Sequence, residues 1–194
     1  MKILLVIPSL PLGGAERVMS VLANKFVALN HDVHLVLLAK DEIFYSLDKR
    51  IVVHQLGFEN KGKLSKIISE VKTYFRLRKL IKNENPDVVL SFMVKYNIFT
   101  IMASAFLKTK VFVSDRCNPN KKIPWLRDFL RDNLYKKATG VIAQTQLAKS
   151  VLMQSTKHQN IKVIHNPLKQ MEIKPYENRE KIILNVGRLA PEKG

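Results

Sequence analysis

Cysteine, glycine and acidic residues are all scarce in this sequence of 194 residues. The one cysteine, Cys117, excludes a disulfide within the chain and is typical of a protein of the reducing cytosol. The seven glycines never form the spaced triplet of a dinucleotide-binding loop, and none begins the Gly-Lys-Ser/Thr sequence of a P-loop. The sequence therefore argues against a disulfide-stabilised secreted domain, a nicotinamide enzyme and a P-loop NTPase.

Long apolar runs are also missing. Ile3–Ile7 is followed at once by Pro8 and Pro11, which is not the pattern of a secretory signal. The later run Ile98–Leu107 is interrupted by hydroxyl residues and is shorter than the ~20 residues that span a bilayer. With 46% hydrophobic and 25% charged residues, we expect a soluble globular protein.

The scarcity of acidic residues leaves a large positive charge. Lys and Arg number 33 against 16 Asp and Glu, so the formal net charge is +17 at pH 7. Such an excess favours anionic partners and says nothing about the fold. A non-catalytic basic module that binds nucleic acid or an anionic membrane is one interpretation. No nucleic-acid-binding motif and no basic surface interleaved with stacking aromatics supports it, so we expect no specific nucleic acid partner.

Metal-binding patterns are absent as well. The histidines have no recognisable metal-ligand spacing, and the single cysteine adds no ligand set. We therefore predict neither a metal site nor a cofactor. The histidines are His31, His34, His54, His158 and His165.

What the sequence does have is a regular alternation of apolar runs and helically spaced apolar residues. The runs predict strands at Ile3–Ile7, Val33–Leu38, Ile51–Leu56, Val88–Phe92, Val111–Ser114, Val141–Gln144 and Lys162–His165. The helical spacing predicts helices at about Glu16–Leu29, Leu64–Lys82, Asn97–Leu107, Trp125–Lys137 and Gln146–Gln154. This alternation predicts an α/β fold with a Rossmann-like, doubly wound parallel sheet. Ligands of such sheets bind beyond the carboxyl ends of the strands, where we expect the loops at Gly13, Ser91, Asp115, Thr145 and Asn166.

The loop that contains Gly13 and Gly14 is the strongest local signal. It joins a buried strand to a helix, and the first free N–H groups of a helix attract an anion such as a phosphate. Adjacent glycines permit either positive φ or a close approach of another group to the backbone. The alternative is that the two glycines only make a tight connection.

A change of pattern divides the chain near its end. Residues 1–166 form the predicted Rossmann-like domain, and 167–180 is polar, lacks apolar periodicity and is interpreted as a linker. A new strand and a glycine-bounded loop follow in 181–194, which we interpret as the truncated start of a second domain.

Four motifs together resemble the GT-B glycosyltransferases of family 4. They are Gly13-Gly14-Ala15-Glu16-Arg17, Asp87-Val88-Val89-Leu90-Ser91-Phe92, Val163-Ile164-His165-Asn166-Pro167 and Val186-Gly187-Arg188-Leu189-Ala190-Pro191-Glu192-Lys193-Gly194. The resemblance implies that residues 1–166 bind the acceptor as the amino-terminal half of a GT-B fold. It also implies that residues 181–194 begin the domain that binds the nucleotide-sugar donor.

The resemblance also assigns roles to these residues. Gly13 and Gly14 match the glycine loop that lies near the donor diphosphate, and Arg188 and Lys193 match the basic pair that neutralises the departing diphosphate. Fixed cations stabilise the charge that develops on a leaving group. The implied reaction is metal-independent, retaining transfer of a hexose or N-acetylhexosamine from a nucleotide-sugar. The donor-binding glutamates of the family fall outside the sequence, so we predict that the 194-residue chain alone is inactive.

The segment from Ser114 to Pro119 narrows the expected acceptor. It resembles a variant found in enzymes that extend glycans or polyprenyl-diphosphate-linked oligosaccharides, with Asp115 in place of a glutamate. Asp115 is the candidate to orient or deprotonate the acceptor hydroxyl, and Arg116 the candidate to hold a phosphate or a sugar. The alternative is that an Asp115–Arg116 pair caps the loop.

A basic helix is expected between Lys61 and Lys82. Its apolar residues Leu64, Ile67, Ile68, Val71, Tyr74, Phe75 and Ile81 repeat with the spacing of a stripe packed on a core. One interpretation is therefore a core helix with a solvated basic face. The other is a helix whose cations, among them Lys72, Arg76 and Lys79, meet the acceptor diphosphate or an anionic membrane. On that view the protein is cytoplasmic and peripheral on the inner face of the cell membrane.

Overall fold

The computed structural model describes residues 1–39, 41–58, 63–116, 124–168 and 182. Its strands are β1 (Lys2–Ile7), β2 (Asp32–Ala39), β3 (Val52–Phe58), β4 (Val88–Phe92), β5 (Lys110–Ser114), β6 (Gly140–Ala143) and β7 (Ile161–Val163). Its helices are α1 (Gly14–Ala28), α2 (Lys63–Glu84), α3 (Val94–Ala103), α4 (Trp125–Leu134) and α5 (Gln146–Thr156), with a short 3₁₀ helix, η1 (Tyr135–Lys137). All the strands and helices predicted within residues 1–166 are confirmed, with shifted ends.

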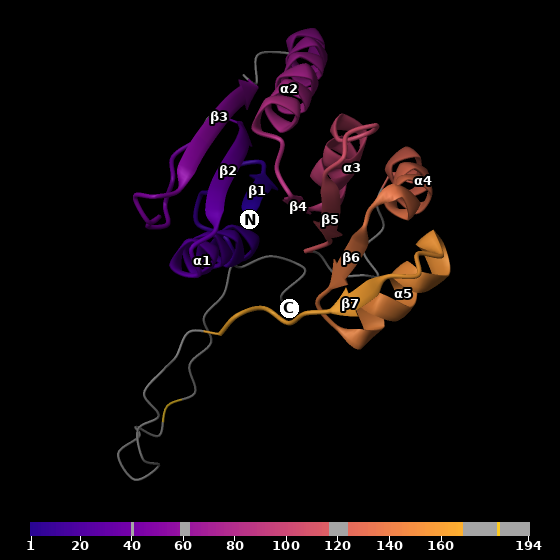
Figure 1. Ribbon diagram of the computed structural model, residues 1–194. Helices are drawn as coiled ribbons and strands as arrows, with labels where there is room; N and C mark the ends of the chain where they lie inside the picture. The colour runs from indigo at the N-terminus through magenta and orange to yellow at the C-terminus, as the bar shows by residue number, and fades with distance from the viewer. Residues whose placement is uncertain (40, 59–62, 117–123, 169–181, 183–194) are drawn as a thin grey trace.

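The strands form one sheet in the order β3-β2-β1-β4-β5-β6-β7, and every neighbouring pair is parallel (Figure 1). The strand order reverses at β1, because β2 and β3 lie on one side of it and β4 to β7 on the other. This is the predicted doubly wound, Rossmann-like sheet. Its carboxyl strand ends share one edge, which we call the rim.

β1 occupies the centre because its side chains are apolar on both faces. Ile3 to Ile7 are at most 4% exposed, as a strand covered on two sides requires. Ile3, Leu5 and Ile7 pack on one face with Val18 and Met19 of α1. Leu4 and Val6 pack on the other face with Leu77 and Ile81 of α2.

The two faces are covered unequally. Among the described helices, α1 lies alone on its face, whereas α2, α3, α4 and α5 lie side by side on the other (Figure 1). This follows from the right-handed crossover rule, because the chain moves one way from β1 to β2 and the opposite way from β3 to β7. No described helix therefore covers the sheet face next to α1 beyond β4.

Two of the shifted element ends have an identifiable structural cause. α3 was expected at Asn97–Leu107 but spans Val94–Ala103, between two residues with positive φ, Met93 (73°) and Phe106 (63°). An apolar periodicity cannot reveal such left-handed breaks. β7 ends at Val163 rather than His165: the Ile164 N–H still donates to the Ala143 carbonyl oxygen at 2.9 Å, and β6 ends at Ala143.

The apolar stripe of α2 is only partly buried, which corrects the predicted core-packed stripe. Ile67, Ile68, Val71 and Phe75 are 64%, 52%, 50% and 62% exposed. Thr73 and Leu77, on either side of Phe75 in the sequence, are fully buried, so the four exposed side chains lie on the face of α2 that is turned away from the sheet. None of the helices in the described part of the chain is both long and apolar enough to cross a bilayer.

Substitutions in α2 test this orientation. Leu77→Ala removes a fully buried side chain and should lower the free energy of unfolding by about 2–5 kcal/mol. Phe75→Ala, two residues earlier and exposed, should change it by less than about 0.5 kcal/mol. Urea unfolding followed by circular dichroism measures both. Equal losses would contradict the helix orientation.

Candidate active site

The site at the rim begins with Asp115, the first residue after β5. Its Oδ1 accepts hydrogen bonds from the Tyr135 hydroxyl of η1 and from Asn97 Nδ2 of α3, the latter at 3.0 Å. Asn97 Nδ2 also lies 2.8 Å from the Tyr135 hydroxyl oxygen and 3.1 Å from the Ser114 carbonyl oxygen. The side chains of Asn97 and Tyr135, from two different elements, therefore fix one oxygen of the Asp115 carboxylate.

Burial changes the pKa of the Asp115 carboxyl group. It raises the pKa of the Asp115 carboxyl, while the Tyr135 hydrogen bond, the charge of Arg131 and the Asn97 hydrogen bond act in the opposite direction. Burial, together with the adjacent Asp115, raises the pKa of Tyr135 well above its ordinary value, so its hydroxyl keeps its proton and donates. A carboxyl group with a raised pKa and one anchored oxygen is suited to accept a proton from a bound hydroxyl.

Arg116 is held next to Asp115 by other contacts. Its Nη1 donates to Asn166 Oδ1 at 2.5 Å, and the same oxygen accepts from Gln144 Nε2 at 2.9 Å. The guanidinium carbon lies 3.8 Å from the centre of the Phe92 ring, a cation–π contact. Residues after β4, β5, β6 and β7 are thereby joined through one side chain.

The guanidinium remains a cation with spare hydrogen-bonding capacity. Burial lowers the pKa of Arg116 to about 10, so the group stays charged at neutral pH. Its Nε is buried and has no hydrogen-bond partner within the described residues. Asp115 and Arg116 make no ion pair with each other in this described part of the rim, which speaks against the alternative of a paired loop cap.

The glycine loop lies at the same edge but is more enclosed than predicted. Gly13 has φ −170°, so of the two predicted reasons for glycine it is the close approach of another group, and not positive φ, that applies there. The Tyr45 hydroxyl accepts the Gly13 N–H at 3.0 Å and donates to the Gly13 carbonyl oxygen at 2.7 Å. The carboxylate of Glu16 also lies against Gly13, whereas Gly14 faces open space. An anion at this helix start would meet Gly14 rather than the Gly13 N–H.

Sequence reasoning missed Met93, at the end of β4. Its φ of 73° and ψ of 134° are strained for a residue other than glycine. Its N–H donates to the Ser114 carbonyl oxygen at 3.0 Å, and its carbonyl accepts from the Asn97 N–H at 2.8 Å. The strained residue thus ties the loop before α3 to the strand that carries Asp115. A methionine in a β-type sequence gives no signal of such a conformation.

The remaining candidate residues lie elsewhere. Arg188 and Lys193 are outside the described residues, as is most of the predicted linker and second domain. Lys72, Arg76 and Lys79 lie exposed on α2, and Arg76 Nη1 donates to the Leu56 carbonyl oxygen at 2.8 Å. These three cations therefore belong to an outer surface and not to the group around Asp115.

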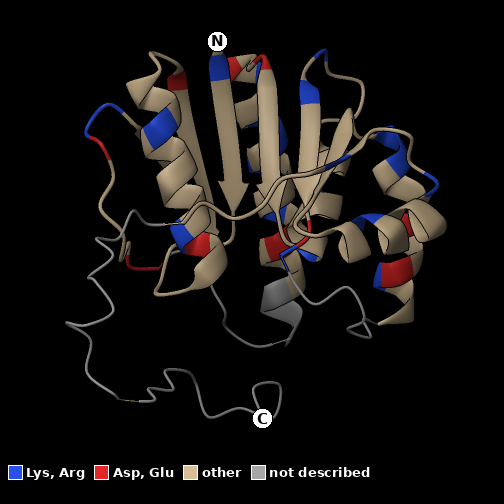
Figure 2. Cartoon of the chain, turned by 90° about the horizontal axis from the view of Figure 1, so that it is seen from below, with Lys and Arg blue, Asp and Glu red and all other residues tan. Residues whose placement is uncertain are grey.

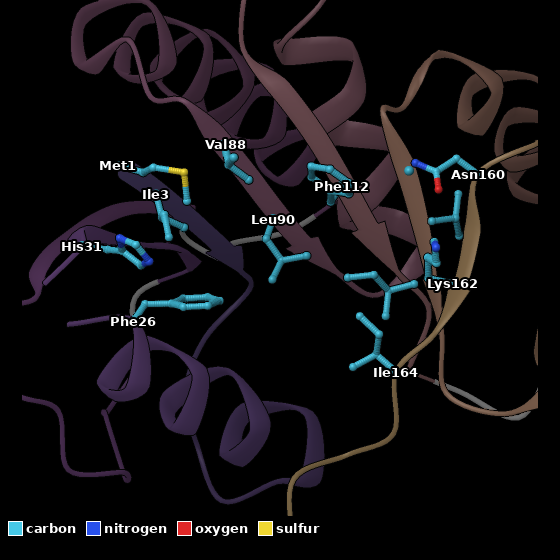
Figure 3. A pocket seen from close by; sticks show the side chains of 13 residues that line it. Met1, Ile3, Phe26, His31, Val88, Leu90, Phe112, Asn160, Lys162 and Ile164 are labelled. Carbon is cyan, nitrogen blue, oxygen red and sulfur yellow. The ribbon is translucent and has the colours of Figure 1, made fainter. Parts of the chain in front are cut away.

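A pocket of about 290 Å³ lies on the open half of the sheet beside α1. Phe26 of α1 faces Leu90 of β4, Phe112 of β5 and Ile164 after β7 across it (Figure 3). Its walls are almost wholly apolar and cannot neutralise a diphosphate. The pocket is therefore separate from the rim, where the phosphate site is predicted.

A doubly wound parallel sheet with polar loops gathered at its carboxyl edge is the arrangement of α/β enzymes that bind nucleotides. Among solved structures the fold is that of a GT-B glycosyltransferase domain. The chain is similar to the lipopolysaccharide outer core galactosyltransferase WaaB in its apo form, with a TM-score of 0.68 and 16% identity over 92% of this chain and 50% of that one. It is also similar to Anabaena HepE in complex with UDP and glucose, with a TM-score of 0.64 and 19% identity over 87% of this chain and 45% of that one.

The family follows from the sequence comparison. Residues 12–169 match the family model described as Glycosyltransferase Family 4, so the chain belongs to this family. A curated relative from Campylobacter jejuni is 30% identical over 100% of this chain and 54% of its own length. That relative is named GalNAc-α-(1→4)-GalNAc-α-(1→3)-diNAcBac-PP-undecaprenol α-1,4-N-acetyl-D-galactosaminyltransferase. The chain spans about half the length of this relative.

The buried Asp115 makes a pH-dependent prediction. Because its pKa is higher in the folded chain than in the unfolded chain, its ionisation costs stability as pH rises above about 4. Asp115→Asn should therefore make the chain more stable than the wild type at pH 7.5, with a smaller difference at pH 4. Tyr135→Phe, which removes a donor to the carboxylate, should steepen the loss of stability with pH. Urea unfolding at both pH values measures these differences, and a wild-type advantage over Asn at pH 7.5 would contradict the assignment.

Proposed function

We propose that this chain is the acceptor-binding, amino-terminal domain of a retaining glycosyltransferase. The enzyme transfers a hexose or N-acetylhexosamine from a nucleotide-sugar to a glycan or a polyprenyl-diphosphate-linked acceptor. The observation that carries the proposal is the pair Asp115 and Arg116 at the rim, one anchored by η1 and α3 and the other by the loops after β6 and β7. The C. jejuni relative is named for an activity on an undecaprenol-diphosphate-linked glycan, which supports this class of acceptor.

Asp115 acts on the acceptor hydroxyl in this proposal. Tyr135 and Asn97 hold Oδ1, and no hydrogen bond to Oδ2 is present among the described residues. Oδ2 therefore accepts the hydrogen bond of the acceptor hydroxyl and takes its proton as the new glycosidic bond forms. The raised pKa of Asp115 brings its basicity closer to neutral pH than that of an exposed aspartate.

Arg116 supplies positive charge on the acceptor side. It keeps its charge despite burial, and its ring contact and the bond to Asn166 fix its direction, so it needs little reorganisation to bind a phosphate or a sugar hydroxyl. On the donor side, Gly14 and Gly13 lie near the diphosphate, and Arg188 and Lys193 stabilise it as it departs. Cationic side chains do this without a metal ion.

The domain organisation belongs to the same proposal. Residues 1–166 bind the acceptor, 167–180 link the two domains, and 181–194 begin the nucleotide-sugar domain. Asn166, which holds Arg116, is the last residue of the first of these segments. The rim then faces the donor domain, and the reaction takes place between the two.

The exposed residues of α2 and α4 support attachment to a membrane surface. Ile67, Val71 and Phe75 lie one turn apart on α2, and Trp125 and Phe129 are likewise exposed on α4. The cations Lys72, Arg76 and Lys79 lie on the same stretch of α2. We call these side chains the α2–α4 surface. Apolar side chains among cations are the pattern of a helix that lies at an anionic interface, so the enzyme is placed peripherally at the inner face of the membrane.

The first test concerns transfer. In the enzyme with both domains, Asp115→Asn should lower kcat at least about a hundredfold, because Asn accepts a hydrogen bond but cannot take the proton. Donor affinity should stay within about twofold, since Asp115 touches only the acceptor. Release of nucleoside diphosphate with a lipid-diphosphate-linked glycan measures kcat, and Asp87→Asn, at the opposite edge of the sheet, is the control. Unchanged turnover in Asp115→Asn would contradict the proposal.

The second test concerns the membrane. Lys72→Gln with Lys79→Gln should weaken binding to anionic vesicles by up to about thirtyfold, at about 1 kcal/mol per cation. Lys25→Gln with Lys162→Gln removes the same charge from the face that carries α1 and should have little effect. Vesicle co-sedimentation at 0.1 M and 0.5 M salt, conditions of about 10 Å and shorter screening length, measures the difference. Equal losses of vesicle binding in both double variants would show that net charge alone, and not α2 in particular, causes the binding.

A further inference from the structure

Two imidazoles and a carboxylate meet at the amino ends of the strands, the edge of the sheet opposite the rim. His34 comes from β2, His54 from β3 and Glu84 from the last turn of α2. One ligand atom from each lies within 4.8 Å of the others. Acidic and basic residues gather at this edge near the N-terminus (Figure 2). Because the edge lies at the other end of the strands, the cluster is separate from the site of transfer.

The distances suit a tetrahedral metal ion. Ligand atoms at 2.0–2.1 Å from a tetrahedral Zn²⁺ lie roughly 3.3 Å from one another. His34 Nδ1 lies 2.9 Å from His54 Nε2 and 3.6 Å from Glu84 Oε2. Small movements of the His54 and Glu84 side chains therefore suffice to place all three around one ion. Two imidazoles and a carboxylate are a ligand set that suits Zn²⁺ better than Mg²⁺ or Ca²⁺.

A fourth residue fixes the orientation of the buried imidazole. Asp32 Oδ1 lies 3.3 Å from His34 Nε2, on the far side of the ring from the cluster. A carboxylate that holds one ring nitrogen keeps the proton there and turns the lone pair of the other toward a metal. His34 Nδ1 is therefore presented to His54 and Glu84. His54 donates to it from Nε2 in the metal-free chain and carries its proton on Nδ1 when Nε2 binds a metal.

Lys2 now supplies the positive charge at this place. Its Nζ lies 2.9 Å from Glu84 Oε2 and 3.7 Å from Asp32 Oδ2. The ammonium group can keep its ion pair with Asp32 when it leaves Glu84. Lys2 is therefore a competitor that a metal ion must displace from one carboxylate but not expel from the cluster.

We propose that His34, His54 and Glu84 form a structural Zn²⁺ site with one position open to water. The ion joins the edge strand β3 to β2 and to the end of α2, elements that also meet through side-chain packing, the β2–β3 ladder and the hydrogen bond from Arg76 to the Leu56 carbonyl oxygen. It stabilises the fold at the edge away from the rim and takes no part in sugar transfer.

The test uses the chain stripped with EDTA and then titrated with ZnCl₂ in a calorimeter. One ion should bind per chain, and at a hundredfold excess over the Kd it should raise the Tm by about 5–10 °C. His54→Gln should weaken binding at least tenfold. His165→Gln, which removes an exposed imidazole after β7, should bind as the wild type does.

Two further variants separate a built site from incidental binding. Lys2→Gln should bind Zn²⁺ more tightly than the wild type, because the competing cation is gone. Glu84→Gln should bind it at least tenfold more weakly, and it replaces His54→Gln in the comparison if that variant does not fold by circular dichroism. Co²⁺ should give the visible absorption of a tetrahedral site in the wild type and in Lys2→Gln, but not in the ligand variants His54→Gln and Glu84→Gln. Absence of binding, or equal binding by the wild type and the ligand variants, would overturn the proposal.

Discussion

The burial of β1 between β2 and β4, and between α1 and α2, is the constraint on which the rest of the structure depends. Five consecutive apolar side chains, Ile3 to Ile7, are almost completely removed from water, and each contributes about 1.5–3 kcal/mol. Because β1 is the strand at which the order of the sheet reverses, its position decides which loops meet at the rim. The positions of Asp115 and Arg116 therefore depend on a strand that contains neither residue.

The rim, in contrast, contains several groups that lower the stability of the fold and that a ligand can engage. Asp115 is a buried carboxylate that costs free energy to ionise, and Met93 holds a strained backbone. Arg116 keeps a buried N–H that has no partner among the described residues. Each feature is unfavourable by itself, and the hydrogen bonds from Tyr135 and Asn97 offset only part of the cost. Such features gather at sites that bind or transform a ligand, because a group with unused capacity is what a substrate can engage.

The sequence was sufficient for the sheet and for the position of the rim, because period and run length report directly on burial. It placed Gly13, Asp115 and Asn166 at one edge, as the parallel topology confirms. It failed where the outcome depends on distant partners. Phe75 points outward because Thr73 and Leu77 occupy the side of α2 that meets the core. The meeting of His34, His54 and Glu84 follows from register across separate strands. Tyr135 was expected in a helix, and only the fold brings its hydroxyl to Asp115. No local pattern contains that information.

The position of β1 also sets the order in which the chain can fold during synthesis. Its partner β2 follows about thirty residues later, but the other edge waits for β4, since Ile3 pairs with Val88. At about 5–20 residues per second, a ribosome needs roughly 4–17 s to make that intervening stretch. Throughout this interval one edge of the most apolar strand in the sheet is unpaired. A nascent chain of this topology therefore exposes an unpaired apolar strand edge, a template for pairing with other chains, until β4 has been made.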